Sequence, residues 1–234
     1  MLPVAILAGG LATRIRPVTE TIPKALIDIA GEPFAFHQLR LLRRCGIENV
    51  VYCVGYLGEM ISEVVGDGSR FGISLTYSFD GPSLLGTGGA IRQALPYLGE
   101  DFFVLYGDSY LDIDYRLIEE AYIASNMPAL MTVFRNEGRW DKSNVEFSEG
   151  RINKYSKTDH TPLMTHIDYG LGILSKNLFN KIPPSVSFDL SSIYEDLADS
   201  GLLAAFEVRQ RFYEVGSFLG IEELSTYLKK TGES

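Results

Sequence analysis

The sequence predicts an α/β fold in which a mostly parallel sheet carries helices on both faces and a small antiparallel addition. Short apolar runs without polar alternation, such as Val4 to Ala8, are typical of strands buried on both sides. Amphipathic segments separate these runs, and a strand–helix–strand order implies parallel strands with right-handed crossovers. Alternation on either side of Glu149-Gly150 indicates an antiparallel hairpin in the second half.

The expected elements follow one another from end to end without a repeat or a low-complexity linker. Pro33 fits the first turn of a helix, where its missing N–H is no loss, and Gly46 ends that helix. Strands are expected over residues 4–8, 47–54, 72–78, 101–108, 129–134, 166–174, 204–208 and 212–215. Further helices are expected over residues 58–65, 90–98, 117–125, 175–180, 191–199 and 221–229.

Composition narrows the classes of function. The chain has 234 residues, is 46% hydrophobic and carries a net charge of −9, which argues against nucleic acid or an anionic membrane as a partner. Cys45 and Cys53 are interpreted as reduced core residues rather than a disulfide or a metal site. The sequence shows no signal peptide and no membrane span, so a cytoplasmic location is expected.

The first strand opens into a glycine turn. Gly9-Gly10 would let backbone N–H groups approach a ligand closely, and the cations Arg14, Arg16 and Lys24 follow. This arrangement suits a phosphate. The alternative is a tight turn with surface arginines, and neither a dinucleotide fingerprint nor a Walker motif is present.

Two later stretches point to the same edge of the sheet. The glycines of Gly86-Thr87-Gly88-Gly89 would let backbone lie flat against a planar ligand, although Thr87 is alternatively a helix cap. Asp108 ends an apolar strand, where a carboxylate is costly to bury unless it is paired or binds a metal. Asp112 and Asp114 are alternative ligands but fit a solvated edge better, and Tyr106 is expected in the core.

The string from Leu7 to Thr19, Leu-Ala-Gly-Gly-x-x-Thr-Arg-x-x-Pro-x-Thr, is followed by Pro23-Lys24 and closely resembles the signature loop of sugar-1-phosphate nucleotidylyltransferases (NDP-sugar pyrophosphorylases). Leu85 to Gly89 and Gly107-Asp108 are similar to further elements of that family. The resemblance runs the full length and implies a Rossmann-like fold of the nucleotide-diphospho-sugar transferase type. The loops look most like those of heptose-1-phosphate guanylyltransferases and N-acetylmuramate-1-phosphate uridylyltransferases.

The resemblance implies roles for the residues of the nucleotide half. Arg14 would bind the β- and γ-phosphates, Lys24 would act on the α-phosphate, and Asp108 with Glu214 would hold Mg²⁺. Glu214 stands where the family usually has aspartate. The residues expected to contact the nucleotide are Ala8, Gly9, Gly10, Thr13, Gly86, Thr87, Gly88 and Asp108.

The acceptor half departs from the family pattern. Lys157 matches the lysine that meets the sugar phosphate, while Ser156 replaces the usual glutamate. Asp168-Tyr169-Gly170 stands where the family has Asn-Ala-Gly, and the segment from Trp140 to Asn144 does not match its counterpart. Asn144, Lys157, Asp168 and Gly170 are therefore expected to bind an unusual second substrate.

The resulting hypothesis is a single nucleotidyltransferase domain over residues 1–234, with 1–135 mainly nucleotide-binding and 136–234 mainly acceptor-binding and supplying the second metal ligand. It would transfer a nucleoside monophosphate from an NTP to a sugar 1-phosphate. Assembly as a homo-oligomer is left open. One alternative is transfer to a non-sugar phosphate such as phosphocholine. Another is a non-catalytic nucleotide-sensing domain, against which the retention of Lys24, Asp108 and Glu214 argues.

Overall fold

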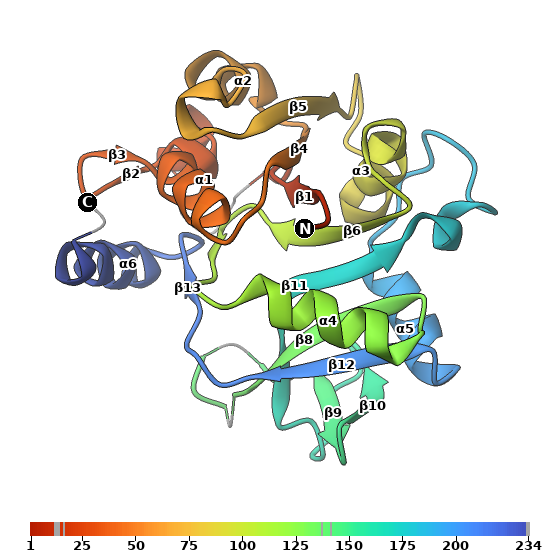
Figure 1. The fold of residues 1–234 in the computed structure, drawn as a ribbon. Coiled ribbons are helices and arrows are strands. Elements are labelled where there is room, and N and C mark those ends of the chain that lie inside the picture. Colours follow the sequence, from red (N-terminus) through yellow and green to blue (C-terminus); the bar gives the residue numbers. More distant parts are fainter. Residues whose placement is uncertain (12–14, 16, 137, 141, 233–234) are drawn as a thin grey trace.

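The computed structural model describes residues 1–11, 15, 17–136, 138–140 and 142–232. Within these residues the core is a nine-stranded sheet in the order β10-β9-β11-β6-β1-β4-β5, to which β8 is added beside β11 and β12 beside β8 (Figure 1). Its strands are β1 (Val4–Leu7), β4 (Asn49–Val54), β5 (Ser74–Phe79), β6 (Asp101–Tyr106), β8 (Ala129–Arg135), β9 (Val145–Ser148), β10 (Arg151–Tyr155), β11 (His166–Ser175) and β12 (Leu203–Val208).

Helices and short strand pairs complete the described chain. The α-helices are α1 (Phe34–Arg44), α2 (Gly58–Val65), α3 (Gly86–Ala94), α4 (Tyr115–Ser125), α5 (Ser191–Asp199) and α6 (Phe218–Thr231). The 3-10 turns are Val18–Glu20, Lys24–Leu26, Ser69–Phe71, Leu95–Tyr97 and Lys176–Phe179. The two short pairs are β2 (Asp28–Ile29) with β3 (Glu32–Pro33), and β7 (Ser109–Tyr110) with β13 (Tyr213–Glu214).

The parallel part of the sheet has β1 at its centre. Val4 pairs in register with Val50 of β4 on one side and with Phe103 of β6 on the other. β5 continues the parallel order beside β4, while β11 runs antiparallel to both β6 and β8. The predicted α/β fold is confirmed, and the antiparallel strands extend the sheet on the β6 side.

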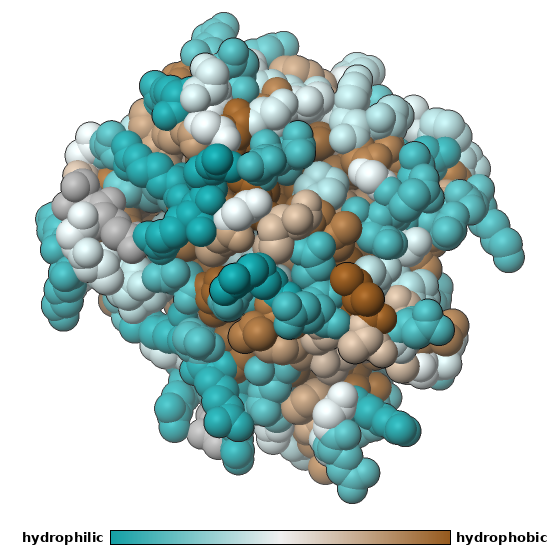
Figure 2. Space-filling view, viewed as in Figure 1, coloured by the Kyte–Doolittle hydropathy of each residue, from teal (hydrophilic) through white to brown (hydrophobic). Residues whose placement is uncertain are grey.

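Both faces of the sheet are covered by helices, as expected for apolar strands without polar alternation. Successive side chains of β1 point to opposite faces. Val4 and Ile6 belong to a buried cluster that includes residues of α1, α2 and α4, whereas Ala5 belongs to one that includes residues of α3 and α5. The face of the molecule that Figure 2 shows is largely hydrophilic, with separated hydrophobic areas.

The predicted hairpin is present. Glu149 and Gly150 link β9 to β10 with φ values of 52° and 75°. Positive φ at both central residues is the geometry of a type I′ turn, whose twist matches that of the paired strands. Among the residues that the structure describes, no helix combines the length and apolar character that a membrane span requires.

One helix begins earlier than its sequence suggests. α3 starts at Gly86 rather than at Ala90, so the glycine stretch forms its first turns. A Cβ at Gly88 would lie 2.2 Å from the Phe188 ring, and one at Gly89 would lie 2.5 Å from the Val186 carbonyl oxygen. The glycines therefore make room for the segment that packs on this helix end.

Candidate active site

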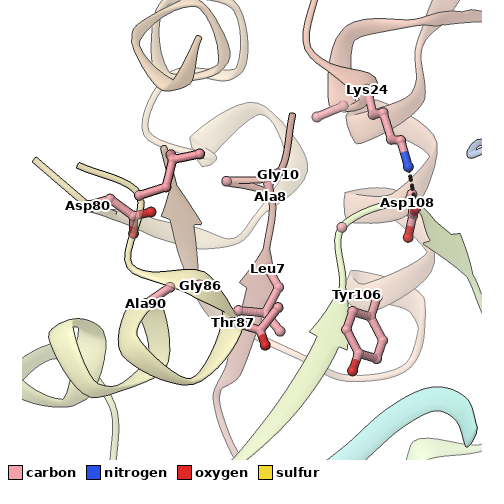
Figure 3. Close-up of a pocket in the computed structure, with 14 residues that line it drawn as sticks. Leu7, Ala8, Gly10, Lys24, Asp80, Gly86, Thr87, Ala90, Tyr106 and Asp108 are labelled. Carbon is pink, nitrogen blue, oxygen red and sulfur yellow. Dashed lines mark hydrogen bonds and ion pairs between the residues drawn. The ribbon is translucent and has the colours of Figure 1, made fainter. Parts of the chain in front are cut away.

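A cavity of about 260 Å³ opens where β1 and β6 end, at the carboxyl edge of the parallel strands (Figure 3). This edge is where open α/β sheets bind their ligands. The cavity is lined by Leu7, Ala8, Gly9, Gly10, Lys24, Ala25, Asp80, Leu84, Gly86, Thr87, Ala90, Tyr106, Gly107 and Asp108. It brings together most of the residues that the sequence assigned to the nucleotide.

The glycine turn after β1 forms one wall of this cavity. Gly9 touches the neighbouring turn, because a Cβ there would lie 3.0 Å from the Gly55 amide nitrogen. Gly10 faces open space, with no described atom within 4 Å of its Cβ position. Thr13 and Arg14, which are expected to contact phosphate, lie outside the described residues.

Lys24 and Asp108 meet at one end of the cavity. Lys24 begins a 3-10 turn after Pro23, and Asp108 follows the Gly107 turn at the end of β6. Lys24 Nζ lies 2.7 Å from Asp108 Oδ2, and their side chains are 19% and 28% exposed. Partial burial reduces solvent screening, so the attraction between these two groups is stronger than in a fully exposed ion pair.

Glu214, from a distant part of the chain, also lies at the end of the cavity where Lys24 and Asp108 meet. β13 pairs antiparallel with β7, which places Glu214 opposite Ser109, and the Val215 N–H donates to the Asp108 carbonyl at 2.9 Å. A methyl group at Gly216 would lie 2.5 Å from Glu214 Oε2 and 3.3 Å from both Asp108 Oδ2 and Lys24 Nζ. The two carboxylates and the ammonium group thus surround one backbone position.

These carboxylates suit a magnesium ion that also binds a ligand. Within the described ranges, no group of three or more Asp, Glu, His or Cys side chains is arranged to hold a metal by itself. Mg²⁺ is commonly held by one or two carboxylates together with substrate phosphates and water. Asp108 and Glu214 match that donor set, although the Glu214 carboxylate already accepts hydrogen bonds from the Gly216 N–H and the Ser217 hydroxyl.

The far end of the cavity is formed by the start of α3 and the end of β5. Gly86 and Thr87 line it, whereas Gly88 packs against Phe188 and does not. Thr87 is not the helix cap considered above: its Oγ1 accepts a hydrogen bond from the Leu190 N–H at 2.8 Å. Thr87 therefore holds the 188–190 segment against α3.

The four expected acceptor residues lie on β11 and beside it. Asn144 Oδ1 accepts from the Asp168 N–H at 2.9 Å, and Asp168 Oδ1 accepts from the Gly170 N–H at 3.0 Å. Gly170 has φ +92°, and a Cβ there would meet Tyr106 at 3.4 Å. Lys157 Nζ pairs with Asp189 Oδ1 at 2.9 Å. Because Tyr106 also lines the cavity, it connects this group to the cavity.

Asp168 is the most perturbed carboxyl group in this region. Burial raises its pKa to about 6, and the Gly170 hydrogen bond and the Lys157 charge oppose that rise. Burial, together with the neighbouring Asp168 carboxylate, also raises the pKa of Tyr106. A carboxyl group with a shifted pKa beside a cavity is a common sign of a functional site.

The sequence reasoning missed two polar residues of the cavity wall. Tyr106 was expected in the core with Phe102 and Phe103, which are buried, but it lines the cavity instead. Asp80 was not considered, although an acid directly after a parallel strand was the available signal. Asp112 and Asp114 serve the scaffold: Asp112 accepts from Arg44 and Tyr227, and Asp114 caps α4.

The chain is similar to several known proteins. N-acetylmuramate alpha-1-phosphate uridylyltransferase of Neisseria meningitidis serogroup B is 40% identical over 124 residues, which cover 53% of each chain. UTP–glucose-1-phosphate uridylyltransferase of Synechocystis sp. is 30% identical over 216 residues, covering 84% of this chain and 55% of the relative. HddC of Yersinia pseudotuberculosis, crystallised with GMP-PN, shares the fold with a TM-score of 0.80 at 24% identity, covering 97% of this chain and all of HddC.

The chain spans little more than half the length of the two curated relatives. Residues 4–143, more than half of the chain, match the family described as Nucleotidyl transferase. That match covers the glycine turn, Lys24, α3 and Asp108. The chain therefore belongs to the nucleotidyl transferase family.

Proposed function

We propose that the protein transfers a nucleoside monophosphate from an NTP to a sugar 1-phosphate, giving an NDP-sugar and pyrophosphate. The observation that carries this proposal is the convergence of Lys24, Asp108 and Glu214 at one end of a glycine-walled cavity. Family membership supports the chemistry, and the two relatives are named for transfer to sugar 1-phosphates.

The reaction requires positioning and charge neutralisation more than acid–base catalysis. A phosphate oxygen of the acceptor attacks the α-phosphorus in line and pyrophosphate leaves, so two anions must approach each other. At about 4 Å and an effective dielectric of about 20, one pair of unit charges repels by ~4 kcal/mol. Lys24 would offset this repulsion at the α-phosphate and Arg14 at the β- and γ-phosphates.

Asp108 and Glu214 would hold Mg²⁺ together with the phosphates. When bound, the ion neutralises phosphate charge and orients the leaving group. Lys24 pairs with Asp108, so an incoming triphosphate would compete with Asp108 for its ammonium group.

The acceptor would lie beyond Tyr106, next to β11. Asp168 would accept a hydrogen bond from a substrate hydroxyl, and the acceptor phosphate would displace Asp189 from Lys157. Asn144 would act by orienting the Asp168 backbone, and Gly170 by allowing the turn that directs Asp168.

A cationic acceptor such as phosphocholine is the second candidate. Asp168 and Asp189 both lie close enough to raise the pKa of Tyr106 and Tyr155 in addition to the effect of burial. Two carboxylates close to the same tyrosines would also attract a quaternary ammonium group.

A pyrophosphate-release screen of four NTPs against sugar 1-phosphates and phosphocholine tests both candidates. We expect one sugar 1-phosphate to give turnover that requires Mg²⁺. Binding of an NTP without turnover on any acceptor would instead support a nucleotide-sensing domain.

Asp108→Asn is the matching variant for this screen. We expect turnover to fall at least ~10²-fold, a loss of about 3 kcal/mol of transition-state stabilisation, because the variant loses the charge that would hold the metal. Asp199→Asn, at the exposed end of α5, is the control and should keep full turnover. An active Asp108→Asn enzyme would refute the assignment.

A further inference from the structure

Asp80 lies in the wall of the cavity, directly after the carboxyl end of β5. In Figure 3 it stands on the opposite side of the cavity from the Lys24–Asp108 pair, next to the start of α3. Its backbone N–H donates to the Val54 carbonyl at 2.9 Å, which fixes the residue to the end of β4. A nucleotide with its phosphates at Lys24 would extend its base toward Asp80.

The Asp80 carboxylate has fewer hydrogen-bond donors than it needs. Oδ2 accepts from the Leu85 N–H at 3.1 Å, while Oδ1 is shielded from solvent and has no partner among the described residues. Burial raises the pKa of Asp80, and the bond from Leu85 opposes that rise. A buried acceptor without a donor costs folding free energy, so a ligand that supplies donors would gain from binding here.

An ionised carboxylate only accepts hydrogen bonds, and this property discriminates among the bases. Guanine presents two adjacent donors on its Watson–Crick edge, N1–H and the N2 amino group. Uracil and thymine present one N–H between two carbonyl oxygens. Cytosine and adenine present an amino group beside a ring nitrogen that is an acceptor. Guanine is therefore the base that offers two donors to Asp80.

We propose that Asp80 selects guanine by accepting hydrogen bonds from N1–H and the N2 amino group, so that the donor substrate is a guanine nucleoside triphosphate. The proposal rests on the nucleotidyl transfer proposed above and names the substrate of the same site. Because Oδ1 is shielded from solvent, the carboxyl group would have to turn toward the cavity for Oδ1 to accept one bond. Oδ2 would accept the other bond with the lone pair that Leu85 leaves free.

The wall around Asp80 offers the remaining contacts of a base. A methyl group at Gly55 would meet Leu84 Cδ2 at 2.7 Å and Asp80 Oδ2 at 2.9 Å, so Leu84 and the carboxylate both lie close to Gly55. Leu84 is 40% exposed and lines the cavity. It would provide an apolar surface for the ring, with Gly86 lining the cavity beside it.

Binding measurements on the unaltered chain test the base. Dissociation constants for GTP, ITP, ATP, CTP and UTP are measured by titration calorimetry with Mg²⁺ and without an acceptor. ITP lacks only the amino group at C2, so we expect GTP to bind at least roughly tenfold more tightly than ITP and than the other three. This series requires no variant and is independent of any effect of mutation on folding.

The Asp80→Asn variant tests the residue. Its amide would donate to a carbonyl at C2 and accept from N1–H, which matches xanthine rather than guanine. We expect GTP to bind at least roughly tenfold more weakly and XTP more tightly than to the parent chain. If Asp80 had only a structural role, its substitution would not change the preference between GTP and XTP. The control Asp199→Asn should keep the preference of the parent chain.

The outcomes separate this proposal from the one on which it rests. Preferred binding of ATP, CTP or UTP, or equal binding of GTP and ITP, would overturn guanine selection and leave nucleotidyl transfer intact. A parental GTP-to-XTP ratio in Asp80→Asn would overturn the role of Asp80. Failure of every triphosphate to bind would overturn the proposed function as well.

Discussion

Lys24 shows how a single residue combines two interactions in this site. Its ammonium group pairs with Asp108 and faces the cavity, where it would meet the α-phosphate. We expect Lys24→Ala to lower kcat more than it weakens nucleotide binding, because the lost charge acts mainly in the transition state. Single-turnover kinetics and calorimetry measure the two effects, with Lys229→Ala on the exposed end of α6 as the control. An unchanged kcat with a raised KM would show that Lys24 binds only the ground state.

Burial of Asp168 lowers the free energy of unfolding by an amount that depends on pH. Its ordinary pKa of 3.8 is raised to about 6 by burial, so the folded state retains a proton that the unfolded chain has lost. The free energy of unfolding therefore falls as the pH rises from about 3.8 to about 6. At ~1.4 kcal/mol per pKa unit, ionisation of Asp168 costs on the order of 3 kcal/mol.

We expect Asp168→Asn to remove this loss. Urea denaturation measures the free energy of unfolding of the variant and of the parent chain. Above about pH 7 this free energy should be higher in the variant by up to ~3 kcal/mol, and near pH 4 the two should be nearly equal. Turnover of the variant should fall. Asp199→Asn should show no such difference between the two pH values. If Asp168→Asn changes the free energy of unfolding equally at the two pH values, the titration of Asp168 is not the cause of the change.

At the scale of elements, the start of α3 depends on contacts with a distant segment. Gly86 has φ +70°, and a Cβ there would lie 2.6 Å from the Phe188 carbonyl oxygen. Gly81 has φ +88° but faces open space among the described residues. Gly81→Ala therefore adds only backbone strain, whereas Gly86→Ala adds both strain and a backbone clash.

We expect Gly81→Ala to cost about 1 kcal/mol of stability and Gly86→Ala at least about 2 kcal/mol. Thermal and urea unfolding of the two variants measure the difference. Equal losses would show that the 186–188 segment yields to the new methyl group.

At the scale of the whole molecule, the pairing of β7 with β13 completes the charged end of the cavity. This pairing places Glu214 beside Asp108, and Asp108 itself lies in the turn at the end of β6. We expect Glu214→Gln to raise the Mg²⁺ concentration for half-maximal turnover at least ~10-fold, because one of the two carboxylates proposed to hold the ion loses its charge. The exposed Glu222→Gln on α6 is the matched control. An unchanged Mg²⁺ requirement would remove Glu214 from the metal site.

The sequence by itself determined the local structure and the sheet edge at which the cavity lies. Apolar runs such as Val4 to Leu7 became buried parallel strands, and Glu149-Gly150 became the hairpin turn, because backbone preference and side-chain period act over a few neighbouring residues. The glycine turn and the acid after β6 followed from the same local rules. Asp108 could therefore be placed before its neighbours were known.

Only the tertiary structure decided which of these groups meet. Lys24 and Asp108 are 84 residues apart, and their contact depends on how the chain packs rather than on any local pattern. The same holds for Glu214 beside Asp108, for Tyr106 and Asp80 in the cavity wall, and for the packing of Phe188 that sets the start of α3. The free energy that selects these contacts comes from burying both faces of one shared sheet, to which distant segments contribute together.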